Sequence, residues 1–265
     1  MTFLNAIMDA LMSLLGRLPP AAALSCFSAL TGALVLALFK VSSRPARIAA
    51  ARNRALARVL ELWLWREDAV GGLVSVGRAM RDSLLYLATM ARPALVSVVP
   101  MALLLVQANA WFGARPLREG ETALVVARAM QDGVAEALEL DGGAAVAVEA
   151  AVASPAVREK AWRIRARAAQ GVQTLRLTGP GVSEGKRVSV GAGLMRVSVR
   201  RGSGFWDGLL YPDEPQVRAP LASVTVAQPE ASYSVLGVQT TWFPAVLVIS
   251  LCAGLALKRP MGVEF

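Results

Sequence analysis

Three long apolar stretches divide the chain. Residues 21–39 and 93–111 carry no charged side chain, and residues 241–257 form a third uncharged stretch. A helix of about 19 residues is about 28 Å long, close to the hydrocarbon thickness of a bilayer. The pattern therefore predicts three transmembrane helices, at residues 21–39, 93–112 and 241–257.

The segment before the first apolar stretch has a different period. Its apolar residues recur at helical spacing, which predicts an amphipathic helix within residues 1–20 that lies on the membrane surface. The residues of this stripe are Phe3, Ile7, Leu11, Leu14 and Leu15. A cleavable signal peptide is the alternative, and it is disfavoured because Asp9 and Arg17 interrupt the segment and no basic region precedes it.

Residues 40–92, between the first two apolar stretches, have a helical pattern in two parts. The segment after Pro45 is rich in helix formers, and the run REDAVGG at 66–72 supplies a turn before the helical spacing resumes. We therefore expect a helical hairpin. Trp63 and Trp65 fit membrane-interface anchors or the core of this hairpin better than a binding site.

From Glu121 onwards the pattern alternates between polar and apolar residues. Residues 162–167 and 195–200 alternate strictly, which is typical of half-buried strands whose arginines point outward. Shorter apolar runs at 175–177, 187–190 and 224–226, with a glycine turn at 191–193, bring the total to about seven strands. Residues 113–240 therefore read as an all-β, sandwich-like domain.

Residues 202–220 have few strand formers and read as a long loop. The loop contains Phe205, Trp206 and Tyr211. These aromatic residues either form a contact surface or cover the open end of the sandwich, and we favour the second interpretation.

Charge gives the predicted helices a direction. The chain carries a net charge of +9 with a mean hydropathy of +0.49, and residues 40–92 hold ten basic and four acidic residues. Residues 113–240 are nearly balanced, with 15 basic and 13 acidic residues. By the positive-inside rule the hairpin and the tail at 258–265 lie in the cytoplasm, whereas the N-terminus and the β-domain lie outside. We expect a bacterial inner-membrane protein.

Two further sets of residues suit a membrane surface. Aromatic and basic residues at the ends of the apolar stretches are candidate interface anchors: Trp111, Phe112, Trp242, Lys258 and Arg259. The hairpin also carries a basic face: Arg47, Arg52, Arg54 and Arg58. Lipid headgroups are its favoured partner, with ribosomal RNA as the alternative and no other nucleic acid expected.

The layout resembles that of the YidC-type insertase superfamily. The resemblance is carried by FLNAIMDALMSLLGRLPP before the first stretch, RPARIAAARNRALARVLELW after it, and LATMARPALVSVVPMALLLVQANAWFG around the second. It covers roughly residues 1–112 and 241–265, and it implies three helices around a groove that eases polar parts of new membrane proteins across the bilayer. Two departures are the absence of a central arginine in the first stretch and the inserted β-domain.

Without that arginine, a polar groove depends on uncharged side chains. The candidates are the polar residues of the apolar stretches: Ser25, Ser28, Thr31, Ser97, Gln107, Asn109 and Ser250. The alternative is that the hydroxyls bond their own helix backbone or join helices together. Gln107 and Asn109 are expected near the outer interface.

Residue types that support catalysis are sparse. The chain has no histidine, its two cysteines, Cys26 and Cys252, lie in apolar stretches, and no phosphate-binding glycine motif occurs. We expect no enzyme, no metal site, no cofactor and no small-molecule substrate. The favoured function is an insertase-like or chaperone-like membrane protein whose partners are the bilayer and other membrane proteins. The alternative is an accessory subunit that docks in a larger envelope complex through its β-domain.

Overall fold

The chain folds into two compact units, described in a computed structural model for residues 2–43, 45–64, 69–144, 146–167, 171–235 and 237–262. The first unit, here the β unit, comprises Met1–Cys26 and Leu105–Val246. The second, here the helical unit, comprises Phe27–Leu104 and Leu247–Phe265. Three helices pass from one unit into the other, so each unit holds part of every predicted span.

Helices and β-sheets make up the fold, as the sequence predicts. The helices that enter the helical unit are α2 (Pro20–Ser42), α3 (Pro45–Leu64), α4 (Ala69–Phe112) and α6 (Trp242–Lys258). Two segments, Pro20–Ser42 and Pro93–Phe112, are long and apolar enough to cross a membrane. Helix α6 is equally apolar but has 17 residues.

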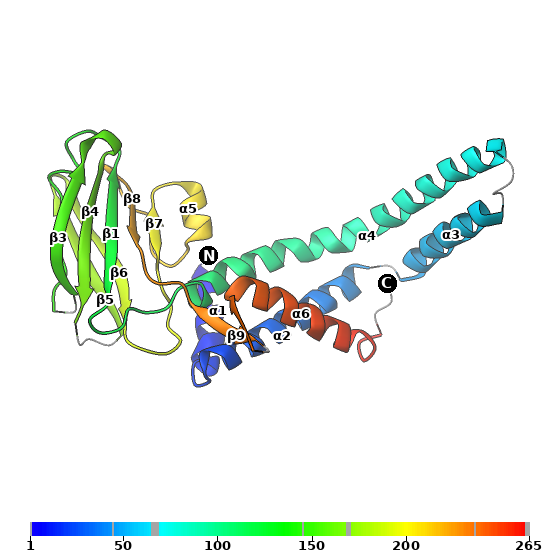
Figure 1. Ribbon diagram of the computed structural model, residues 1–265, viewed down its shortest axis with the longest axis horizontal. Helices are drawn as coiled ribbons and strands as arrows, with labels where there is room; N and C mark the ends of the chain where they lie inside the picture. The colour runs from blue at the N-terminus through cyan, green and yellow to red at the C-terminus, as the bar shows by residue number, and fades with distance from the viewer. Residues whose placement is uncertain are drawn as a thin grey trace. The chain divides into compact units, whose positions relative to one another are not determined.

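Helices α3 and α4 form the predicted hairpin. Figure 1 shows α3 beside the first part of α4, and Arg58 Nε lies 3.2 Å from Asp82 Oδ2 between them. The predicted turn at 66–72 is shorter on its C-terminal side, because α4 already begins at Ala69. Residues 65–68, with Trp65, lie outside the described residues.

Helix α4 has no boundary where the predicted hairpin ends and the predicted span begins. It continues for 44 residues with Pro93 and Pro100 inside it. Each proline removes one backbone donor from the helix, so the carbonyl one turn earlier loses its usual partner, yet the helix continues through both positions. Hairpin and span are therefore one helix.

The described residues of the β unit form ten strands. A five-stranded sheet has the order β3-β4-β1-β8-β7, a three-stranded sheet has the order β2-β5-β6, and β9 and β10 form a hairpin. All the pairings within these sheets are antiparallel. The strands are β1 (Thr122–Ala129), β2 (Glu139–Asp141), β3 (Val146–Ser154), β4 (Glu159–Ala166), β5 (Gly171–Gly179), β6 (Val182–Val190), β7 (Arg200–Gly202), β8 (Leu221–Val226), β9 (Ser232–Val235) and β10 (Val238–Thr241).

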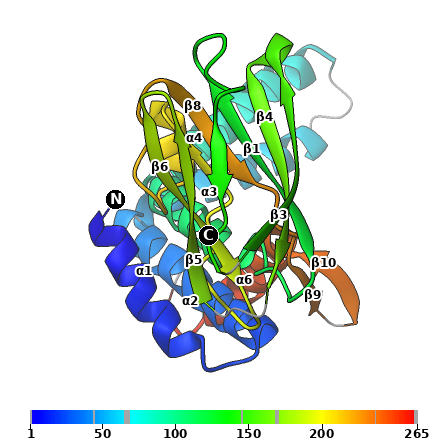
Figure 2. The same cartoon turned by 90° about the vertical axis from the view of Figure 1, so that its left-hand side faces the viewer.

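The two larger sheets share one hydrophobic core. Val125 and Ile164 from the first sheet cluster with Leu175 and Val188 from the second, and all four are fully buried. Figures 1 and 2 show β5 and β6 as a second layer beside β1 and β4. The alternation predicted for residues 162–167 is confirmed in β4, where buried and exposed side chains alternate along the strand.

The second predicted strand, residues 195–200, is wrong in most of its length. Only Arg200 belongs to a strand, β7. The backbone before it makes other bonds, because Val197 N donates to Ala110 O of α4 at 2.7 Å and Ser198 O accepts from the Lys186 ammonium at 2.6 Å. The predicted outward direction of Arg196 is also wrong, since 14% of its side chain is exposed.

Two helices and a 3₁₀ turn complete the described part of the β unit. Helix α1 (Thr2–Leu15) confirms the predicted helix, but its apolar stripe is divided: Leu15 is buried with Met8 and Met12, whereas Ile7 and Leu14 are exposed. The predicted loop at 202–220 contains a short helix, α5 (Phe205–Leu210). A 3₁₀ turn, η1 (Pro155–Val157), joins β3 to β4.

Candidate functional site

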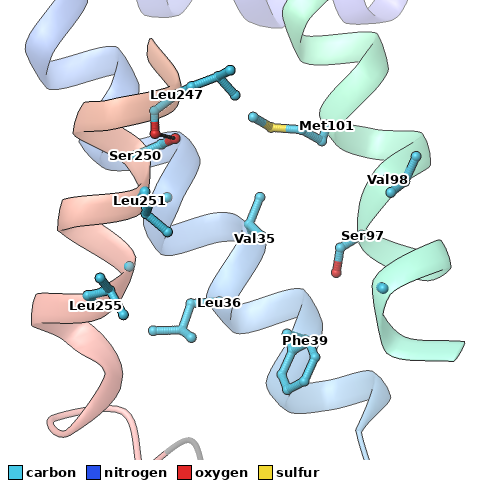
Figure 3. A pocket seen from close by; sticks show the side chains of 13 residues that line it. Val35, Leu36, Phe39, Ser97, Val98, Met101, Leu247, Ser250, Leu251 and Leu255 are labelled. Atoms are coloured by element: carbon cyan, nitrogen blue, oxygen red, sulfur yellow. Dashed lines mark hydrogen bonds between the residues drawn. The ribbon is translucent and has the colours of Figure 1, made fainter. Parts of the chain in front are cut away.

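Helices α2, α4 and α6 line an open groove in the helical unit. Its cavity volume is about 570 Å³, and Figure 3 shows its side chains arriving from all three helices. Met101 points from α4 toward Leu247 of α6, while Val35 and Phe39 belong to α2. Of the lining residues, only Ser97 and Ser250 have polar side chains.

The two serine hydroxyls are turned to their own helices. Ser97 Oγ donates to Pro93 O at 3.0 Å, and Ser250 Oγ donates to Leu247 O at 3.1 Å. A hydroxyl that donates its proton to the backbone can still accept a hydrogen bond but has no proton left to donate to a ligand. The groove is thus apolar, where the sequence predicts a polar one.

The other hydroxyl candidates do not line this groove. Ser25 Oγ donates to Ala21 O at 2.9 Å, and Thr31 Oγ1 donates to Phe27 O at 2.8 Å. Ser28 and Thr31 are buried in α2. The alternative interpretation, that hydroxyls bond their own helix backbone, therefore describes four of the seven predicted groove residues.

Helices α2 and α6 are in close contact at Gly32, which also lines the groove. A Cβ atom added to Gly32 of α2 would lie 2.3 Å from Ser250 O of α6. Backbone atoms cannot rotate away from such a contact, so glycine is required there. Small residues at this crossing allow the two helix backbones to touch, as is common between helices in membranes.

Gln107 lies in a polar cluster of the β unit. It is fully buried, and its Nε2 donates to Asn5 Oδ1 of α1 at 2.6 Å. Asn5 Nδ2 in turn donates to Pro212 O at 2.9 Å. Asn109 is half-buried near Gly113 at the end of α4. Gln107 lies five residues before the end of α4, and it is hydrogen-bonded to the side chain of Asn5.

Arg196 connects this cluster to two carboxylates. Its Nε donates to Asp213 Oδ1 at 2.7 Å and its Nη1 donates to Asp9 Oδ1 of α1 at 2.8 Å, while Nη2 lies 3.5 Å from Gln107 Oε1. Burial raises the pKa of Asp213, and the Arg196 guanidinium opposes this shift. One arginine thus joins α1, α4 and the loop after α5.

Removal of the Arg196 guanidinium should release α1. We expect Arg196→Ala to lower the protection of α1 by about 1–3 kcal/mol, the usual cost of leaving a buried polar group unpaired. Hydrogen exchange of the full chain measures this, with faster exchange expected at residues 5–12 and unchanged exchange in β1 and β4. Arg163→Ala is the control, because Arg163 is largely exposed and pairs with Glu149 away from α1. Equal effects of the two variants would contradict the role of Arg196.

A second ionic cluster is buried under the loop after α5. The side chains of Lys186 and Glu214 are 1% and 5% exposed, and the ammonium donates to the carboxylate, to Ser198 O and to Ser198 Oγ. The other carboxylate oxygen accepts from Arg187 N at 2.8 Å. Burial lowers the pKa of Lys186. Burial acts to raise the pKa of Glu214, but the interactions of this carboxylate with Lys186 and Ser198 outweigh that effect, and its pKa is lowered. Sequence periodicity alone did not single out this pair.

A bidentate ion pair stabilises the connection from α4 to β1. Arg115 Nη1 and Nη2 donate to Glu121 at 2.8 and 2.7 Å, and Arg118 N adds a third bond to the same carboxylate. The Arg115 hydrogen bonds lower the pKa of Glu121 to about 2. The carboxylate is therefore ionised at physiological pH and holds the connection in place.

The predicted interface anchors lie in different surroundings. Phe112 is fully buried against Tyr233, whose hydroxyl donates to Phe112 O at 3.1 Å, so its side chain does not reach the surface and the anchor prediction for it is wrong. Trp111 and Trp242 are half-buried, as is Lys258, and Arg259 is exposed. On the predicted basic face of α3, Arg47 and Arg54 are exposed, whereas Arg52 and Arg58 are half-buried.

Within the part of the chain that the structure describes, no group of three or more histidine, cysteine, aspartate or glutamate side chains could hold a metal ion. Cys26 and Cys252 are both exposed and unpaired with each other.

No family model, curated protein or solved structure matches this chain. The features of the chain that bear on function are the apolar groove and the charge pattern of the sequence.

Proposed function

We propose that this chain is an integral membrane protein that receives an apolar transmembrane segment of another protein in the groove between α2, α4 and α6. The function is insertase-like or chaperone-like and does not involve catalysis. The observation that carries the proposal is the open apolar groove of about 570 Å³. The resemblance to the YidC-type layout agrees with it.

Membrane insertion is supported by two helices of sufficient length and apolarity, and α6 would add a shorter third span. The excess of basic residues in 40–92 supports a cytoplasmic hairpin, with residues 113–240 outside as a sandwich of the two larger sheets. A bacterial inner membrane is the proposed compartment. Lipid headgroups are the proposed partner of the exposed arginines on α3.

The groove chemistry favours an apolar occupant. Its two serine hydroxyls donate to backbone carbonyls and its other lining side chains are apolar, so a polar segment would find only two hydroxyl acceptors there. Its walls include glycine, alanine and serine, which allow another helix backbone to approach closely. The occupant we favour is therefore an apolar client helix held at the side of the three helices. A polar segment in transit across the bilayer is disfavoured.

Site-specific photo-crosslinking tests this function. A benzophenone side chain at Val98, which lines the groove, is expected to form adducts with newly made membrane proteins. The matched control is the same label at Val96, which is also exposed on α4 but does not line the groove. Adducts only with lipid at both positions would overturn the proposal.

A second candidate function is an accessory subunit of an envelope complex, and one observation favours it. Strand β3 is an edge of the five-stranded sheet, and residues 148–154 along it are exposed, including Val152 at 68%. An open edge of this kind can pair with a strand of another protein. Two experiments separate the functions. A stoichiometric partner after gentle purification supports the subunit, whereas crosslinks from Val98 to newly made membrane proteins without such a partner support the client-binding groove.

A further inference from the structure

Helix α5 presents two aromatic side chains to the outside of the β unit. Phe205 is 75% exposed and Trp206 is 69% exposed, and their rings touch edge to face with centroids 5.5 Å apart. The interpretation that they cover an open end of the sheets is therefore wrong. The aromatic residues of the sheets behave differently: Trp162 and Tyr233 are 2% and 4% exposed.

The segment that carries these aromatics is fixed to α1 and to α4. Immediately after α5, Pro212 O accepts from Asn5 of α1, and Asp213 binds Arg196. Asn5 also binds Gln107 of α4. Phe205 and Asn5 line the same surface cavity of about 590 Å³, so α5 lies next to α1.

The hydrogen bonds that run from Gln107 through Asn5 to Pro212 show how far along α4 the end of α5 lies. Gln107 lies five residues before the end of α4 at Phe112, which corresponds to about 7.5 Å along the helix axis. The loop after α5 is thus level with the last turns of α4. If α4 crosses the bilayer, this level is the boundary between headgroups and acyl chains, where tryptophan is enriched.

Neighbouring groups make the surface of α5 suitable for lipid. Asp207 binds Arg200 at 2.7 Å and Asp213 binds Arg196 at 2.7 Å, so the nearest carboxylates already carry cations. Paired in this way, these two carboxylates oppose contact with lipid headgroups less than free carboxylates would.

We infer that α5 is a membrane contact of the β unit, with Phe205 and Trp206 inserted among the lipids of the outer leaflet. The inference rests on the proposed membrane placement. Besides the predicted spans, this contact would hold the β unit at the membrane surface through a segment that does not cross the bilayer. The occupant is the bilayer itself, and a protein partner at this site is an outcome that the test below would detect.

Spin-label accessibility in vesicles of phosphatidylcholine and phosphatidylglycerol tests this contact. The full chain carries one label at a time, at Trp206→Cys, at Val96→Cys in α4 or at Val152→Cys in β3, after replacement of Cys26 and Cys252 by serine. All three positions are exposed, which limits folding effects. Oxygen accessibility reports lipid, and accessibility to a water-soluble nickel chelate reports solvent.

We expect the ratio of oxygen to nickel accessibility at 206 to be several-fold higher than at 152 and to approach that at 96. A label at 206 that behaves like the label at 152, while 96 remains in lipid, overturns the contact and leaves the membrane placement intact. Shielding of 206 from both reagents indicates a protein partner and also overturns it. Solvent access at 96 would refute the membrane placement itself.

Discussion

Replacement of Lys186 by methionine should lower the free energy of unfolding of the β unit by about 3–5 kcal/mol, the range for breaking a buried ion pair by removing one partner. The reason is the carboxylate that stays behind. Glu214 is 5% exposed and would lose the cation that balances its charge. Methionine keeps most of the volume of the lysine side chain, so the loss reflects charge and hydrogen bonds and not a cavity.

The double variant Lys186→Met with Glu214→Gln separates these causes. Its loss should be smaller than that of Lys186→Met alone, because a neutral amide is less costly to bury than an unpaired carboxylate. Arg176→Met is the matched control, since Arg176 is an exposed cation on the neighbouring strand β5. Hydrogen exchange of β5, β6 and β8 in the full chain gives the free energies. If Lys186→Met and Arg176→Met had equal effects, the buried pair would not contribute as described.

The sequence contains part of the signal for this pair. Side chains at every second position of a strand share a face, so Lys186 lies on the same face of β6 as the buried Val188 and Val190. A buried cation is therefore readable from the period of two. The partner of Lys186 cannot be predicted in this way, because Glu214 is 28 residues away in an irregular segment whose path depends on tertiary packing.

Strict alternation predicted β4 correctly and residues 195–200 incorrectly. In β4 both neighbouring strands are present, and the backbone pairs with them along its length. At Val197 the backbone donor is taken by Ala110 O at the end of α4. The position of a helix end against the sheets is a long-range property, and no local pattern of polar and apolar residues contains it.

The polarity of the groove could have been predicted from local rules. A serine or threonine within a helix can bond the carbonyl three or four residues earlier, and Ser97, Ser250 and Thr31 all do so. Counting polar residues in the apolar stretches therefore overestimates the polarity of the surface they line. The close approach at Gly32 is different, since it depends on which face of α6 meets α2.

Gly32→Ala should weaken the packing of α2 on α6 by about 1–3 kcal/mol, the usual cost of forcing extra atoms into a packed contact. The added methyl would meet Ser250 O at 2.3 Å and Ser250 C at 3.0 Å, so the helices must separate. Because Ser250 also lines the groove, the separation changes the groove wall. We therefore expect a lower thermal unfolding midpoint in detergent and fewer adducts from the benzophenone label at Val98.

Gly254→Ala provides the matched control on the facing helix. A Cβ at Gly254 would meet only Gly32 O, at 3.9 Å, which is an ordinary van der Waals contact. Alanine also has a higher helix propensity than glycine, so this variant should be neutral or more stable. Gly77→Ala, whose Cβ would meet nothing within 4 Å, should behave in the same way. If Gly32→Ala were as stable as these two variants, the α2–α6 crossing would be looser than described and would not set the shape of the groove.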